Sequence, residues 1–444
     1  MRSTLAFHAK PLGSTSPTVH GGSLALRRAV ALAFSATLAL SGCGSDVPRG
    51  PTSPPTTPGP TAGLTITPGP TQTPRPAAEV YAEIRSAVEA IRGLQPTKAV
   101  EPVSLDETQL KTNLTADFDK ENTADELKLA EDELITLGLL PEGSSLRRVM
   151  LDFQSGQVAG YYSPEKDQLF VVSRSGGVGG AEMVTYAHEF THQLDDQALG
   201  LDKLGLDVAD QSDRQLARLA LVEGDAVSVQ ASYMTSNLTP QQLGEVLAAA
   251  GDPEALEALQ KAPPFVRETA LFPYQQGLAF VTVIMAGGGY GAVDAAFKDP
   301  PNSSEQVIHP DKYVAREAPV PVPIPRDVAA TLGAGWTVAG QDTLGELILE
   351  IWLKQGGVAP ADASAAAAGW GGDRLVILRG PDGAVGVGLV TTWDTPADAA
   401  AFNLAASMAS RALDAGSAVT VSSDRRVVVA MGDRAADIAT ALAN

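Results

Sequence analysis

The sequence predicts an α+β protein in which a mostly helical domain is followed by a small domain that mixes helices and strands. Three observations carry this prediction. Apolar residues recur at helical spacing through most of 77–285. One hairpin pattern interrupts them at 157–173. From about Val328 onward, two strand pairs alternate with helices, which is typical of a separate α+β unit.

The length of 444 residues is sufficient for two or three domains. The chain carries 32 Lys+Arg against 52 Asp+Glu, a net charge of −20. Such an acidic chain repels phosphate backbones, which disfavours nucleic-acid binding. The same net charge disfavours binding to anionic lipid through a basic surface. The single cysteine, Cys43, excludes internal disulfides and Cys-rich zinc sites. Nothing in the sequence indicates an oligomeric state.

The N-terminus has the pattern of an export signal. Two arginines, Arg27 and Arg28, precede a short apolar run over 29–40, which is too short for a permanent membrane span. The run ends in Leu40-Ser41-Gly42-Cys43, which resembles the bacterial lipobox, in which the cysteine is acylated and becomes the first residue of the mature protein. We expect residues 1–42 to be a signal peptide and the protein to be held at the membrane through Cys43. An ordinary secretory signal or a buried helix is the alternative.

A Pro/Thr-rich tether is expected after Cys43, so that residues 43–76 form one anchoring segment. Such a segment cannot bury apolar area, and it adopts extended, partly polyproline conformations. At ~3.1 Å per residue it holds a domain up to ~100 Å from the membrane. The folded part is therefore expected to work outside the cytoplasm.

The folded part is predicted to comprise a helical N-terminal region (77–149), a metal-binding domain (150–327) and a C-terminal α+β domain (328–444). In the first two, the expected helices are 77–94, two within 105–139, 146–153, 181–197, 213–234, and one or two within 240–261. The hairpin strands are 158–162 and 169–172. We expect the apolar stretch 272–285 to be buried and the Pro-rich stretch 299–325 to be irregular.

The C-terminal domain is predicted as helix, two strands, helix, two strands and helix. The expected elements are a helix over 344–354, strands over 375–379 and 385–392, a helix over 396–413, strands over 419–422 and 427–431, and a helix over 435–442.

A metal-binding motif lies on the helix predicted over 181–197. It reads His188-Glu189-Phe190-Thr191-His192, or H-E-x-x-H. Residues four apart share a helix face, so both imidazoles can bind one metal ion. Glu189 lies on the turn between them, from which it can deprotonate a water activated by zinc. The spacing predicts a Zn²⁺ site with His188 and His192 as ligands and Glu189 as the general base.

The third ligand is expected on the next long helix. The extended metzincin motif needs Gly at 195 and His at 198, where this chain has Asp195 and Ala198. Glu223 follows an apolar run inside an amphipathic helix, where an unpaired carboxylate is costly and a metal ion removes the cost. Asp225 is the alternative ligand. Gly224, between them, is small enough to let two helices approach closely at the metal.

Other polar side chains are candidates for supporting roles. His309 is expected to donate a hydrogen bond to the developing oxyanion, with Tyr162 and Tyr274 as alternatives and a structural loop histidine as the competing interpretation. Asp196, one turn beyond His192, either orients a ligand or is a solvated charge at the helix end.

Residues 150–310 resemble a gluzincin-type zinc metallopeptidase domain. The resemblance is carried by residues 186–197 and by Leu-Val-Glu-Gly-Asp-Ala at 221–226. The wider layout, with Phe272-Pro273-Tyr274 and residues 305–313, is similar to a group of bacterial exported metallopeptidase-like proteins. The resemblance implies zinc at His188, His192 and Glu223, with Glu189 as general base. In zincins an edge strand pairs with an extended peptide substrate, and 169–172 is the expected strand here.

The expected function is therefore that of a membrane-anchored, extracytoplasmic zinc metallopeptidase that acts on a peptide or protein substrate. Two alternatives stay open. One is a non-catalytic cell-envelope binding or scaffolding lipoprotein with a vestigial metal site. The other is a metallohydrolase that acts on a non-peptide bond.

Overall fold

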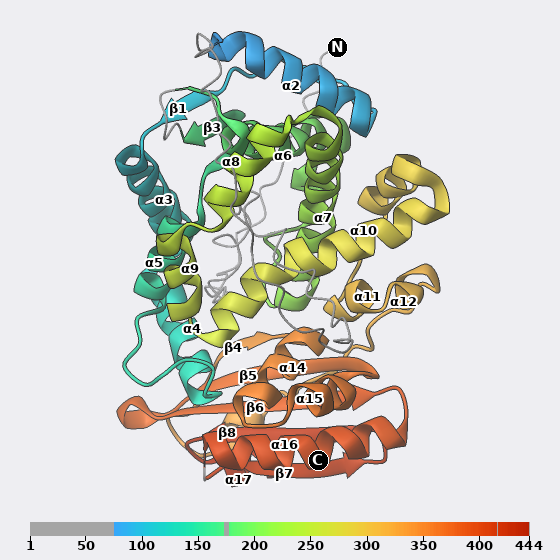
Figure 1. Cartoon of the computed structure of the whole chain (residues 1–444). Helices are drawn as coiled ribbons and strands as arrows, with labels where there is room; N and C mark the ends of the chain where they lie inside the picture. The colour runs from blue at the N-terminus through green and yellow to red at the C-terminus, as the bar shows by residue number, and fades with distance from the viewer. Residues whose placement is uncertain (1–74, 173–176, 415, 444) are drawn as a thin grey trace, which may run out of the picture.

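The computed structural model describes residues 75–172, 177–414 and 416–443 (Figure 1). The predicted signal peptide, Cys43 and nearly all of the tether lie outside these residues. The described chain has the predicted α+β architecture. A helical body with a small sheet is followed by a five-stranded sheet with its own helices, drawn in orange and red at the bottom of Figure 1.

The helical body confirms the helices that apolar spacing predicts. It contains α2 (Ala77–Arg92), α3 (Glu107–Glu121), α4 (Ala124–Thr136), α5 (Leu146–Gln157), α6 (Gly180–Leu199), η1 (Leu201–Leu204), α7 (Ser212–Asn237), α8 (Pro240–Ala250), α9 (Pro253–Lys261), α10 (Pro264–Lys298), α11 (Ser304–Ile308) and α12 (Pro310–Val314). Capping boxes at Asp106 and Thr123 fix where α3 and α4 begin. The stretch 299–325 is less irregular than predicted, because it contains the two short helices α11 and α12.

The small sheet lies against α6 and corrects one prediction. Its strands are β1 (Val103–Leu105), β2 (Gly160–Ser163) and β3 (Gln168–Val172), in the order β1-β3-β2. The hairpin is confirmed, but the edge position of 169–172 is wrong, because β1 pairs in parallel with the free side of β3. β2 is the edge strand beside α6, and all four of its residues are buried.

The 35-residue α10 is more exposed than predicted for an apolar stretch. Phe280 and Val281 are buried, whereas Val283 is 49% exposed. Gly288 and Gly289 have non-helical backbone angles and kink the helix there. By length and composition alone, α10 is also the one described helix that could cross a membrane. In this structure one face of it packs along α7 (Figure 1).

The C-terminal unit is an antiparallel sheet with helices on both faces. Its elements are α13 (Val328–Thr331), β4 (Thr337–Asp342), α14 (Gly345–Gln355), α15 (Pro360–Ala367), β5 (Trp370–Arg379), β6 (Val385–Trp393), α16 (Pro396–Leu413), β7 (Ala418–Ser423), β8 (Arg426–Gly432) and α17 (Ala435–Ala443). The strand order is β4-β5-β6-β8-β7. On β5, Leu375 and Ile377 share a core with α14 and α16, whereas Val376 and Leu378 share one with α17.

The predicted helix–strand order of this unit is confirmed, and three elements were missed. The Ala-rich α15 has no apolar periodicity against a polar face, and α13 is a single turn. β4 was missed because its pattern is broken by a bulge between Val338 and Gly340.

Hydrogen bonds at the start of β5 join this strand to the start of α14 and to the helical body. The indole of Trp370 donates to Asp373, whose carboxylate also accepts the backbone N–H groups of Leu344 and Gly345. Arg374 donates to the backbone oxygen of Asp210, in the loop that precedes α7. Next to it, Asp342 of β4 accepts the backbone N–H of Ser212, the first residue of α7.

Candidate metal centre

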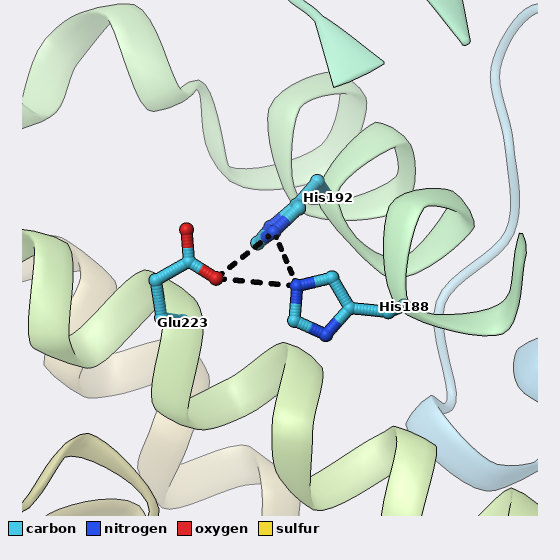
Figure 2. A group of neighbouring side chains, drawn as sticks. All are labelled: His188, His192 and Glu223. Atoms are coloured by element: carbon cyan, nitrogen blue, oxygen red, sulfur yellow. Dashed lines mark hydrogen bonds and ion pairs between the residues drawn. The ribbon is translucent and has the colours of Figure 1, made fainter. Parts of the chain in front are cut away.

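Three predicted ligands come together between α6 and α7. His188 and His192 lie one turn apart on α6, and Glu223 faces them from α7 (Figure 2). The Nε2 atoms of the two histidines are 3.1 Å apart. Oε2 of Glu223 lies 3.2 Å from Nε2 of His188 and 3.4 Å from Nε2 of His192. The H-E-x-x-H spacing and the choice of Glu223 thus lead to one compact group.

The separations match what a zinc ion requires. Zinc binds imidazole nitrogen and carboxylate oxygen at about 2.0–2.1 Å in tetrahedral geometry, which puts neighbouring ligand atoms about 3.3 Å apart. All three observed separations, 3.1 to 3.4 Å, lie close to that value. Two imidazoles and one carboxylate leave the fourth position of the tetrahedron for water or substrate. The residues present therefore fit a catalytic rather than a closed structural zinc site.

A hydrogen bond orients the first ligand. Nδ1 of His188 lies 2.9 Å from the amide oxygen of Gln230, a buried residue about two helical turns beyond Glu223 on α7. An amide oxygen only accepts, so the proton of His188 is on Nδ1 and the lone pair of Nε2 points to the site. The sequence did not single out Gln230.

The pKa values of His192 and Glu223 are shifted in opposite directions by their contact. Burial lowers the pKa of His192, but the carboxylate of Glu223 outweighs it and raises the pKa to about 9. Burial raises the pKa of Glu223, but His192 and His188 outweigh it and lower the pKa to about 2. A protonated His192 beside an ionised Glu223 thus balances the charge that a metal ion would otherwise balance.

Zinc affinity is therefore expected to rise with pH up to about pH 9. Zinc must displace the proton of His192, and below the metal-free pKa each bound ion releases that proton. The expected slope is about tenfold in affinity per pH unit, levelling off near the pKa. Chelator-competition titrations at several pH values, with proton release measured in parallel, check it. An affinity that stays constant between neutral pH and about pH 9 would contradict the arrangement.

Glu189 lies beside the ligands but is not one of them. It is 4% exposed, and its Oε2 accepts the backbone N–H of Tyr162 at 2.9 Å. Edge strand β2 therefore orients the carboxylate of Glu189 through its backbone. A carboxylate held next to, and outside, the ligand set is the arrangement that a general base needs.

Close packing of two glycines brings α10 to the metal centre. A Cβ on Gly224 would overlap the backbone of Gly277 on α10, and a Cβ on Gly277 would overlap the carbonyl of Ala220 on α7. The close helix approach predicted at Gly224 is thus confirmed, and α10 is the helix that packs there. The same approach places Tyr274 beside His188, with ring centroids 6.2 Å apart.

Gly224→Ala is expected to destabilise the protein, although alanine favours a helix interior. The added methyl group would overlap the backbone of α10 and push α7 and α10 apart. Overpacking of this kind typically lowers the free energy of unfolding by about 1–3 kcal/mol. Gly244→Ala on α8, where the methyl group meets open space, is the matched control and is expected to be neutral or stabilising. The measurement is the melting temperature of each variant. Equal melting temperatures for Gly224→Ala and Gly244→Ala would show that the contact between α7 and α10 is not tight.

The structure does not bring His309 to this group. Nε2 of His309 lies 3.0 Å from Oε1 of Glu346 on α14, and that hydrogen bond raises the pKa of His309. Nearby Ser304 donates its backbone N–H to Asp213, which lies ten residues before Glu223 on α7, or about 15 Å along the helix. The position agrees with the competing interpretation of His309 as a structural residue.

The remaining candidates have other partners. The Tyr162 hydroxyl lies 3.0 Å from Asp196 and 3.2 Å from Asp167, so Asp196 orients Tyr162 and not a ligand. Asp225 accepts a hydrogen bond from Arg92 at 2.7 Å, which engages the alternative third ligand away from the metal group. Of the residues considered for oxyanion stabilisation, Tyr274 is the one that lies beside a ligand.

Comparisons with known proteins bear on the C-terminal unit alone. Residues 332–442 match the family model of a domain of unknown function, DUF8575. The match covers the five-stranded sheet and the helices from α14 to α17, and it begins after the helical body. Comparisons with curated proteins and with solved structures found no match.

Proposed function

We propose that the protein is a gluzincin-type zinc metallopeptidase that acts outside the cytoplasm. One observation carries the proposal: the ligand atoms of His188, His192 and Glu223 lie at tetrahedral spacing, while Glu189 is buried next to them and outside the ligand set. A zinc site with only a structural role would not need this second carboxylate beside the ligands.

The chemistry follows from the positions of the side chains. When bound, zinc supplies a Lewis acid that lowers the pKa of water toward 7 and polarises a carbonyl. Glu189 accepts the proton of the attacking water and passes it to the leaving amine. The backbone N–H of Tyr162 keeps the Glu189 carboxylate in place during both transfers. Tyr274, stacked beside His188, is positioned to donate a hydrogen bond to the oxygen that becomes negative.

Peptide-library cleavage by the purified chain tests this function. The expected result is hydrolysis that stops with a metal chelator and returns when zinc is added. Zinc binding without any peptide cleavage would contradict a peptidase and favour the scaffold or the hydrolase of a non-peptide bond. Cleavage that survives complete removal of the metal would contradict the zinc mechanism.

The proposed anchor gives a separate prediction. Cys43→Ala is expected to release the protein from the membrane fraction or to block its processing, because that cysteine would carry the lipid. Membrane fractionation and mass spectrometry of the mature N-terminus check it. A mature protein with an unmodified Cys43 would contradict the lipoprotein assignment and leave the metal centre unaffected.

A further inference from the structure

Arg92 is a buried cation that joins the helices of the metal centre. It is the last residue of α2 and is 1% exposed. Its Nε lies 2.7 Å from Asp225, and its terminal nitrogen lies 2.8 Å from Asp294 and 3.5 Å from Asp195. The guanidinium also lies over the ring of Tyr290, 4.9 Å from its centroid.

The partners of Arg92 lie next to the proposed ligands in sequence. Asp195 is three residues beyond His192 on α6, and Asp225 is two residues beyond Glu223 on α7. The same two helices that carry the ligands are therefore joined a second time, through one guanidinium. Both aspartates have no exposed surface.

The third helix of the cluster reaches Arg92 because of its kink. Asp294 and Tyr290 follow the break at Gly288 and Gly289 in α10. The first part of α10 carries Tyr274 and packs on α7. Arg92 thus holds the second part of α10 to α6 and α7.

The charges explain why this one residue matters. Buried carboxylates repel each other because no solvent screens their charges. A guanidinium has five N–H donors in a fixed planar arrangement, so it can pair with several carboxylates at once. The carboxylates of Asp195 and Asp225 outweigh the effect of burial and raise the pKa of Arg92, which keeps it charged. A lysine keeps the charge, but its single ammonium cannot bridge the same set of carboxylates.

We propose that Arg92 is a positioning residue of the metal centre: by bridging Asp195 and Asp225 it sets the spacing of α6 and α7, and with it the distance from His192 to Glu223. The inference rests on the proposed zinc site. It makes α2 a part of that site.

The way α2 docks supports this. Its apolar residues Val80, Ile84 and Val88 are buried in one cluster with Phe190 and Leu194 of α6. The ring of Tyr81 lies 4.4 Å from that of Tyr186 on α6, whose hydroxyl accepts a hydrogen bond from Arg85. In the described part of the chain, these α2 residues therefore contact the face of α6 that carries Tyr186 and Phe190, and they do not contact the ligand atoms of His188 and His192.

The test compares conservative variants of two arginines that both join distant parts of the chain. Arg92→Lys changes the cluster, and Arg374→Lys changes the junction with the C-terminal unit, where Arg374 binds Gln341 and the backbone of Asp210. Each keeps its charge, so folding is expected to survive, and far-UV circular dichroism of the metal-free proteins verifies it. The probes are zinc affinity by chelator competition and the visible spectrum of the cobalt(II)-substituted protein, which reports ligand geometry.

Arg92→Lys is expected to weaken zinc binding about 10–100-fold, which is typical for the loss of a group that orients the metal ligands without binding the metal. It is also expected to change the spectrum of the cobalt-substituted protein. Arg374→Lys is expected to leave both unchanged. A folded Arg92→Lys with the zinc affinity and cobalt spectrum of the parent would overturn the inference while leaving the zinc site intact. A parent that binds no zinc would overturn the proposed function together with this inference.

Discussion

Glu189→Gln is expected to lower the rate of peptide hydrolysis about 10²–10⁴-fold, the contribution typical of a general base. The amide has the size of the carboxylate, and its oxygen can still accept the N–H of Tyr162, so the position on α6 is kept. What is lost is the ability to take a proton from water. Zinc content is expected to stay at the parent level, because Glu189 lies outside the ligand group.

The measurement is cleavage rate and zinc stoichiometry on the same preparation. Glu182→Gln in the first turn of α6 is a matched control. Its carboxylate accepts the backbone N–H of Gly179, a bond that the amide oxygen can also make, and it is expected to change neither quantity. Full activity in Glu189→Gln would exclude the proposed mechanism. Loss of zinc together with activity would instead show that Glu189 contributes to metal binding.

Glu223→Ala is expected to give the largest loss of zinc affinity among single substitutions on α7. The substitution removes one of the three proposed protein ligands and leaves two imidazoles to hold the metal ion. Losing a group that hydrogen-bonds to a ligand costs about 10–100-fold, and losing the ligand itself is expected to cost more.

Gln230→Ala is the variant with which the zinc affinity of Glu223→Ala is compared. It removes the oxygen that orients His188 but keeps all three ligands, so its effect on zinc affinity is expected to be the smaller one. Chelator competition on the parent and both variants gives the order. A Glu223→Ala protein that binds zinc as tightly as the parent would contradict Glu223 as the third ligand.

The three residues of the candidate metal centre could be predicted from local patterns of residue type and spacing. Two histidines four residues apart on a helix must share a face, and a carboxylate inside an apolar helical run needs a partner. The helices were predictable for the same reason, since their apolar residues repeat every turn. The role of Gly224 could be predicted because glycine costs stability inside a helix, and that cost is offset where a larger side chain would clash with a neighbouring helix.

Features that depend on partners far along the chain were missed. Arg92 and Asp225 are 133 residues apart, and neither position alone indicates a buried ion pair. Asp195 was given no role, although it is fully buried. The expected edge strand at 169–172 became a central strand because three residues of β1, with almost no pattern of their own, pair with it.

His309 shows the limit of reasoning from residue type. A histidine within a Pro-rich segment is compatible with an oxyanion role, but the position of His309 is set by α14, where the buried Glu346 accepts its hydrogen bond. Tyr274 was rated below it, yet the Gly224–Gly277 contact brings Tyr274 to the site. Which candidate reaches the metal centre is set by helix packing.

Diffraction recorded on both sides of the zinc absorption edge, from crystals of the zinc-loaded protein, tests the central claim most directly. The expected result is one anomalous peak per chain, about 2.0–2.2 Å from Nε2 of His188, Nε2 of His192 and a carboxylate oxygen of Glu223. Glu189 is expected near the peak but outside bonding distance. No peak between these three residues, or a peak bound elsewhere in the chain, would contradict the account.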